Sequence, residues 1–231
     1  MNIHKICLFF TLFNCIACME NRVKNAYAEK ETILKSALAE KGFANYFPMY
    51  IRVFKAEKTM EIWGLKDTTY QLFKTYSICN MSGTLGRKYK QGDKQVPEGF
   101  YHIERFNPKS NFYLSLGINY PNQADMFFAE KGNMGGDIFI HGDCVSIGCM
   151  AMTDDVIKEI YIMALEAQKL EQRDIPVHIF PFRMDDNNMQ QYSATFPQWL
   201  SFWQTLKGQY DFFEKEKRLL FVNISAAGEY F

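Results

Sequence analysis

Alternation of apolar and polar residues in the first half of the chain is the feature that most constrains its fold. Three runs alternate in this way, at residues 49–55, 59–63 and 70–78, and short polar turns separate them. A period of two residues places the apolar side chains of a strand on one face, and short turns join strands that run in opposite directions. These runs therefore predict an antiparallel meander.

The rest of the chain adds strands and helices to this meander. Further strand patterns occur at residues 100–104, 112–118, 138–140, 175–182 and 219–224. Pro176 and Pro181 bracket the fourth of these, which predicts an edge strand because proline cannot donate to a ladder. Helical spacing occurs at residues 25–41, in the segment that begins with Thr153 as N-cap, and at residues 196–215. The sum predicts an α+β fold, a mostly antiparallel β-sheet core with flanking helices.

Length and charge narrow the class of protein. A chain of 231 residues can bury a sizeable core and favours one main domain. Its 26 basic and 26 acidic side chains cancel, so no basic excess indicates a nucleic-acid partner.

The N-terminus differs in kind from the rest. Residues 6–18 form an apolar run without charge, and the chain turns polar at Met19. The run is short for a membrane span and is typical of the apolar part of a secretory signal, which indicates export; a buried helix is the alternative. Cys15-Ile-Ala-Cys18 only loosely resembles a lipoprotein box, so lipidation at Cys18 and simple cleavage both stay open.

Cysteine usage adds a constraint on the exported chain. Three of its six cysteines fall in the signal, which leaves Cys79, Cys144 and Cys149. An odd count leaves at least one thiol outside any intramolecular pair, as a nucleophile would be. A Cys144–Cys149 disulfide would disable such a nucleophile, and we do not expect one in active protein.

One stretch combines a base with a thiol. An apolar strand at residues 138–140 leads into His141, and Cys149 follows eight residues later after Ser146 and Gly148. A thiol needs a nearby base to become a thiolate at neutral pH, and His141 is that base if the segment folds back. Small residues beside Cys149 leave backbone N–H groups accessible for an oxyanion. The pattern predicts a cysteine acyl-transfer enzyme.

The same residues resemble a known family. His141-Gly142 followed by Ser146-Ile147-Gly148-Cys149 resembles the YkuD-type L,D-transpeptidase catalytic domain, and the wider pattern resembles its YafK-like murein transpeptidase branch. The ordered supporting segments are residues 51–55, 74–76, 83–86, 90–101, 107–110, 120–122 and 148–154. Several ordered blocks are more specific than the catalytic motif alone.

The resemblance implies a substrate, a place and roles for residues. It implies an envelope enzyme of bacteria that acts on peptidoglycan stem peptides, and possible partners include a wall-linked envelope protein; contact with the membrane would be limited to an N-terminal lipid anchor. Cys149 would be the nucleophile, His141 the general base, and the carbonyl of Gly142 would orient the imidazole. Backbone N–H groups around Gly148 and Cys149 would hold the oxyanion. No metal or organic cofactor is needed.

Departures from the larger family place the chain in the YafK-like branch. The usual His before the Gly-Cys pair is Ile147, the usual Arg after it is Ala151, and the His-to-Cys interval is short. Two further roles stay open. Ser146 either caps the turn before Cys149 or donates to substrate, and Lys88 either contacts the stem peptide or belongs to a solvated loop.

The residue patterns and the resemblance, which covers residues 49–183, together predict a division of the chain. We expect a signal peptide at residues 1–18, a helical segment at 19–48, the L,D-transpeptidase-like catalytic domain at 49–183 and a helix-rich C-terminal extension at 184–231.

Three alternatives accompany this interpretation. His141, Cys144 and Cys149 offer donors of the kind that zinc accepts, with Cys79 or His178 as a fourth, although the spacing fits no common zinc module. A hydrolase of the same family would pass the acyl group to water instead of an amine. A cell-wall binding module without turnover is the third, and it would require neither the base nor the thiol.

Overall fold

The computed structural model describes residues 7–129 and 133–231, with side chains from residue 22 onward. Its helices are α1 (Cys7–Glu40), α2 (Gln123–Phe128), α3 (Asp154–Lys169), α4 (Asp186–Thr195), the 3-10 turn η1 (Pro197–Trp199) and α5 (Leu200–Glu216). Its strands are β1 (Met49–Phe54), β2 (Thr59–Lys66), β3 (Thr69–Ser77), β4 (Asn80–Met81), β5 (Gly99–Asn107), β6 (Ser115–Ile118), β7 (Phe139–His141), β8 (Met150–Ala151) and β9 (Ile175–Phe180).

All these strands belong to one sheet, in the order β3-β2-β1-β9-β5-β6-β7-β8-β4. The predicted meander is confirmed: β1 pairs antiparallel with β2, and β2 with β3. Two neighbouring pairs run parallel, β1 with β9 and β7 with β8. The α+β prediction with a mostly antiparallel sheet is therefore confirmed.

The prediction of an edge strand at residues 175–182 is wrong. β9 lies in the middle of the sheet, parallel to β1 and antiparallel to β5. The ladder to β1 begins at Val177, one residue after Pro176, so the missing N–H of this proline falls outside that ladder. Pro181 lies just beyond the end of the strand. Prolines at the two ends of a strand therefore do not prevent that strand from lying in the middle of the sheet.

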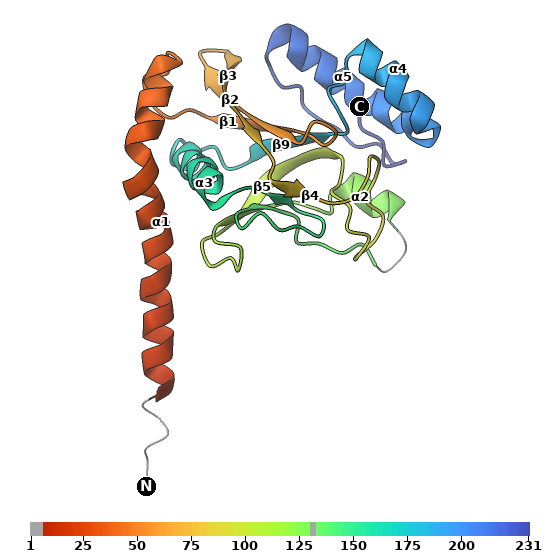
Figure 1. The fold of residues 1–231 in the computed structure, drawn as a ribbon. Coiled ribbons are helices and arrows are strands. Elements are labelled where there is room, and N and C mark those ends of the chain that lie inside the picture. The colour runs from red at the N-terminus through yellow and green to blue at the C-terminus, as the bar shows by residue number, and fades with distance from the viewer. Residues whose placement is uncertain (1–6, 130–132) are drawn as a thin grey trace.

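Helices cover the sheet on both faces (Figure 1). Met49, Ile51 and Val53 of β1 belong to the main core cluster, which they share with buried residues of α3. The intervening Tyr50 and Phe54 belong to aromatic clusters that include residues of α5. Because successive side chains of a strand point to opposite faces, β1 is buried on both sides, and its whole length is solvent-excluded.

The N-terminal helix α1 lies along α3 and extends past the rest of the fold toward the N-terminus (Figure 1). Tyr27 donates to Glu166 across this contact at 2.5 Å, and Lys30 pairs with Asp155 at 2.5 Å. Of the predicted signal peptide, residues 1–6 lie outside the described part, and residues 7–18 are described only as helical backbone. Within the described residues, no helix is long and apolar enough to cross a membrane.

The predicted last strand at residues 219–224 is also wrong. This segment is irregular, and within the described residues its β contact is an isolated bridge between Ile224 and Tyr230. Tyr230 is buried near β5, where its hydroxyl accepts a hydrogen bond from the Asn122 side chain at 2.9 Å. Reciprocal backbone hydrogen bonds between Asn223 and Phe231, together with the buried Tyr230 side chain, thus hold this segment.

The raised pKa of buried Asp125 makes the free energy of unfolding depend on pH. This buried carboxylate closes the capping box of α2 and accepts hydrogen bonds from Tyr101 and from the Asn122 N–H. Burial raises its pKa from 3.8 to about 7, against hydrogen bonds and the charges of Arg87 and Lys88 that lower it. Between these two pH values the folded protein holds a proton that the unfolded chain has released, so rising pH removes stability.

We expect the free energy of unfolding to fall, relative to an Asp125→Asn variant, as the pH rises from 4 to 8. The loss approaches about 4 kcal/mol if no relaxation occurs, at about 1.4 kcal/mol per pKa unit. Urea unfolding of both proteins at several pH values measures the difference. Parallel stability curves for the two proteins would contradict the assignment.

Candidate active site

Strand pairing brings His141 and Cys149 to the same side of the sheet. His141 is the last residue of β7, and Cys149 immediately precedes β8. The parallel register pairs Ile140 with Met150 and His141 with Ala151. Because side chains alternate, Cys149 continues the row to which His141 belongs, and both residues line a cavity of about 480 Å³. The predicted fold-back of this segment is thus present.

The imidazole of His141 has a defined tautomer. Its Nδ1 lies 2.6 Å from the Gly142 carbonyl oxygen, which can only accept, so Nδ1 carries the proton and Nε2 is unprotonated in the neutral ring. The Phe112 ring packs on the imidazole with centroids 4.7 Å apart. Burial lowers the pKa of His141, while the Gly142 hydrogen bond and Asp143 act to raise it. The neutral ring is therefore a base that accepts through Nε2.

Cys149 is the free thiol among the cysteines from residue 22 onward, the part of the chain whose side chains are described. Its Sγ lies 3.6 Å from the Asp137 carbonyl oxygen, to which the thiol donates. Burial raises its pKa above 9.0, a backbone hydrogen bond from Phe139 and the charge of Lys88 lower it, and Asp137 raises it. An unassisted thiolate is consequently scarce at neutral pH, so chemistry at Cys149 requires a base.

Ser146 organises the turn in front of the thiol. Its hydroxyl accepts from the N–H of Cys149 at 2.9 Å and of Gly148 at 3.2 Å, and it donates to the Cys149 carbonyl at 2.7 Å. Gly148 has φ +130°, a conformation that favours glycine. Of the two roles left open for Ser146, the geometry matches the turn cap. The two N–H groups expected to hold an oxyanion are engaged by this hydroxyl in the present conformation.

A disulfide bond holds the loop between His141 and Cys149. Cys79 and Cys144 are bonded, with Cα atoms 5.3 Å apart, across 65 residues of sequence. Cys144 and Asp143 both have positive φ, at 44° and 67°, which side chains rarely adopt without outside support. The bond removes Cys79 and Cys144 from the alternative zinc site, and the described residues hold no group of three or more metal-ligating side chains.

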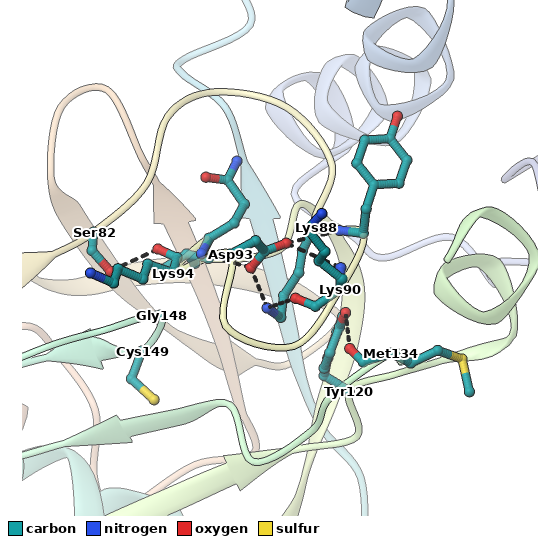
Figure 2. Close-up of polar contacts among 12 residues, drawn as sticks. Ser82, Lys88, Lys90, Asp93, Lys94, Tyr120, Met134, Gly148 and Cys149 are labelled. Carbon is teal, nitrogen blue, oxygen red and sulfur yellow. Dashed lines mark hydrogen bonds and ion pairs between the residues drawn. The ribbon is translucent and has the colours of Figure 1, made fainter. Parts of the chain in front are cut away.

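Lys88 lies in the loop between β4 and β5 and is held by its own neighbours. The side chain is buried and lines the cavity with Cys149. Its Nζ donates to Asp93 at 2.5 Å and to the Lys90 carbonyl at 2.8 Å, as Figure 2 shows. Asp93 also accepts from the backbone N–H groups of Tyr89, Lys90 and Gln95. Lys88 therefore belongs to an ordered cleft wall, with its charge near the thiol.

His178 and His102 lie away from the site. His178 is buried beside Tyr50, whose hydroxyl is 2.8 Å from Nδ1, and burial lowers the pKa of His178 to about 3. His102 faces Asp174 at 3.7 Å. Neither lines the cavity that holds Cys149.

Three contacts at the site were absent from the sequence-based prediction: the Asp137 carbonyl on the thiol, the Phe112 ring on the imidazole and the Asp93 carboxylate under Lys88. A backbone acceptor carries no signal in residue type. Asp93 stands in a Gly-Asp pair within the recognised blocks, and that position was the available clue.

Comparison with known proteins identifies the family to which the chain is similar. Residues 48–179 match the family described as YkuD, L,D-transpeptidase catalytic domain. The chain is 40% identical over 173 residues to "Putative L,D-transpeptidase YafK" of Escherichia coli K12, which covers 74% of this chain and 68% of that protein. The same values hold for the protein of that name from Escherichia coli O157:H7.

Solved structures overlap the chain only in part. The helical cell shape determining protein Pgp2 of Campylobacter jejuni matches with a TM-score of 0.46 and 22% identity, over 64% of this chain and 55% of that one. Bd1075 of Bdellovibrio bacteriovorus matches with a TM-score of 0.39 and 23% identity, over 73% and 63% of the two chains. The chain thus spans about half to two thirds of the solved proteins that it matches, and likeness at this level carries no argument about function.

Proposed function

We propose, because the chain belongs to the YkuD family of L,D-transpeptidase catalytic domains, that it is an exported cysteine acyltransferase acting on peptidoglycan stem peptides. The observation that carries the proposal is the pairing of His141 and Cys149 at one cavity, with Nδ1 of the imidazole committed to Gly142. That commitment leaves Nε2 to take a proton from the thiol. The apolar run at residues 6–18 supports export, and lipidation at Cys18 remains part of the proposal.

The proposed reaction has two halves that share these groups. In the first, Nε2 of His141 takes the thiol proton, Cys149 Sγ bonds to the peptide carbonyl carbon, and the C–N bond breaks as the imidazolium protonates the leaving amine. In the second, an amine attacks the thioester, His141 takes its proton, and the C–S bond breaks to return the thiolate, which regains the proton from His141.

An oxyanion forms in both halves and needs donors. The Gly148 and Cys149 N–H groups are the proposed donors, and the substrate oxygen would replace the Ser146 hydroxyl that they now contact. Lys88 is proposed as a further cleft contact, acting through its charge because Asp93 and the Lys90 carbonyl hold its ammonium group.

Incubation of the purified chain with defined muropeptides, followed by mass spectrometry, tests the proposal. We expect new crosslinks or exchange of the terminal amino acid, because an amine accepts the acyl group. Trimmed stem peptides alone would instead indicate the hydrolase, and intact sacculi in the same assay would reveal release of a wall-linked protein. Binding of muropeptides without any covalent change would overturn the proposal in favour of a binding module.

A further inference from the structure

The peptide bond between Gly142 and Asp143 is held at both of its polar ends. Its carbonyl oxygen accepts the Nδ1 proton of His141 at 2.6 Å. Its N–H, which belongs to Asp143, donates to Oδ1 of Asp154 at 2.8 Å. One planar unit therefore connects the imidazole to a carboxylate at the start of α3.

The carboxylate also lies against the glycine of this unit. A Cβ added to Gly142 would come within 2.5 Å of Asp154 Oδ1 and 3.0 Å of the Phe112 carbonyl oxygen. The Gly142 N–H donates to that same carbonyl and to that of Leu114. The absence of a side chain at position 142 is what allows Asp154 and the turn to approach so closely.

Helix formation does not account for this contact. Thr153 is the N-cap of α3, and its side chain accepts from the Val156 N–H. Both Asp154 and Asp155 follow in the first turn, where a negative charge favours the helix dipole. Asp155 instead pairs with Lys30 of α1 at 2.5 Å. Two adjacent acids with the same helical role thus make different contacts, and only Asp154 reaches the Gly142–Asp143 peptide.

We infer that Asp154 is a positioning residue for His141, acting through the Gly142–Asp143 peptide. The carboxylate fixes the direction of the Gly142 carbonyl and, by accepting from the N–H of the same amide, makes that oxygen a stronger acceptor for the Nδ1 proton. The imidazolium formed when Cys149 loses its proton is stabilised in turn. The inference deepens the proposed function and depends on it.

Other charged and titratable groups near the imidazole also act on the pKa of His141. Asp143 lies in the same turn, and the Cys149 thiol, Lys88 and Asp137 share the cavity with His141. The elements that pack on His141, β6 and β8, place Ser115 and Ala151 opposite it in register. Asp154 is exposed, so its effect on the ring is screened and we expect it to be modest.

Alkylation of Cys149 by iodoacetamide across pH tests the inference on the full chain. Peptide mass spectrometry separates Cys149 from Cys7, Cys15 and Cys18. Near neutral pH the alkylation rate reaches a plateau whose height is set by the population of the thiolate–imidazolium pair. Below the plateau the rate falls with decreasing pH, at a midpoint set by the apparent pKa of the imidazole.

Asp154→Asn keeps an acceptor for the Asp143 N–H but removes the charge. We expect the plateau rate to fall by about threefold and the midpoint of the acid limb to shift to lower pH by about half a unit. The rate at high pH should be unchanged, because the thiol ionises there without the imidazole. Asp154→Ala, which also removes the acceptor, should lower the plateau by about tenfold. Asp155→Asn is the matched control and should behave like the wild type.

The His141→Ala variant distinguishes a failure of the Asp154 role from a failure of the proposed Cys149–His141 pair. If this variant reacts as fast as the wild type at neutral pH, the thiolate–imidazole pair itself is wrong. If it reacts slowly while both Asp154 variants match Asp155→Asn, the pair stands and the role of Asp154 is overturned. Asp154→Asn retains the hydrogen bond, so it supplies the decisive profile even if Asp154→Ala does not fold.

Discussion

Replacing Cys149 with alanine is expected to abolish turnover of muropeptides, lowering the rate by about 10⁴-fold or more while the fold remains intact. The acyl group has no other atom to which it can transfer, because the second half of the reaction begins from the thioester. The cost to stability is small, since the side chain is only partly buried and the thiol is a weak donor to the Asp137 carbonyl. Mass spectrometry of the products and thermal unfolding measure the two effects.

Cys149→Ser is the stricter comparison for this prediction. It keeps a donor of similar size at the Asp137 carbonyl, yet a hydroxyl is far harder to ionise than a thiol, so we expect it to be almost as inactive as the alanine variant. Both variants should retain the Cys79–Cys144 disulfide. Product formation by Cys149→Ala at the wild-type rate would refute Cys149 as the nucleophile.

The apposition of base and thiol was predictable because it is local. His141 and Cys149 are eight residues apart, the strand signal before His141 is clear, and a turn-forming segment separates the two residues. The sequence did not indicate how they meet. Two very short strands pair in parallel here, and a strand of two residues has too few side chains to show a period.

Features that depend on distant segments were missed or misassigned. Arg52 occupies a polar position in the alternation of its strand, yet it is fully buried, because α5 supplies Glu214 at 2.7 Å and covers that face. The partner of Cys144 lies 65 residues away, and three cysteines allow more than one pairing. Asp154 directly follows the predicted N-cap Thr153, but its contact with the Asp143 N–H depends on the fold of the preceding turn.

Loss of Glu98 is expected to destabilise the fold strongly. Its buried carboxylate accepts from Lys55 of the β1–β2 connection at 2.9 Å, from the Gly86 N–H at 2.6 Å and from the Trp203 indole of α5 at 2.9 Å. Burial lowers the pKa of Lys55, and Glu98 acts against that shift. One side chain therefore neutralises a buried cation and joins three separate segments.

Glu98→Ala is expected to cost about 3–5 kcal/mol of unfolding free energy, because it leaves the Lys55 ammonium buried without a counter-charge. The corresponding fall in melting temperature is roughly 10 °C for a chain of this size. Glu31→Ala is the matched control: it removes an exposed ion pair with Lys35 and should cost less than about 0.5 kcal/mol. Urea and thermal unfolding measure both.

A double-mutant cycle separates the lost charge pair from lost packing. In a Lys55→Met background no buried ammonium remains, so Glu98→Gln should cost less there than in the wild type, by about 1–3 kcal/mol. Equal costs in both backgrounds would show that the pair contributes nothing beyond its hydrogen bonds.

Replacement of Glu98 should also change the cavity that holds Cys149. Gly86 and Lys88 lie in the same loop, and Tyr89 of that loop stacks on Trp199 of η1 at 5.8 Å. η1 and α5 follow residue 179, where the family match ends, so segments outside the matched domain support the wall that carries Lys88. At a temperature where Glu98→Gln remains folded, we therefore expect slower alkylation of Cys149 as Lys88 loses its fixed position near the thiol. An unchanged rate would show that this wall is ordered by Asp93 alone.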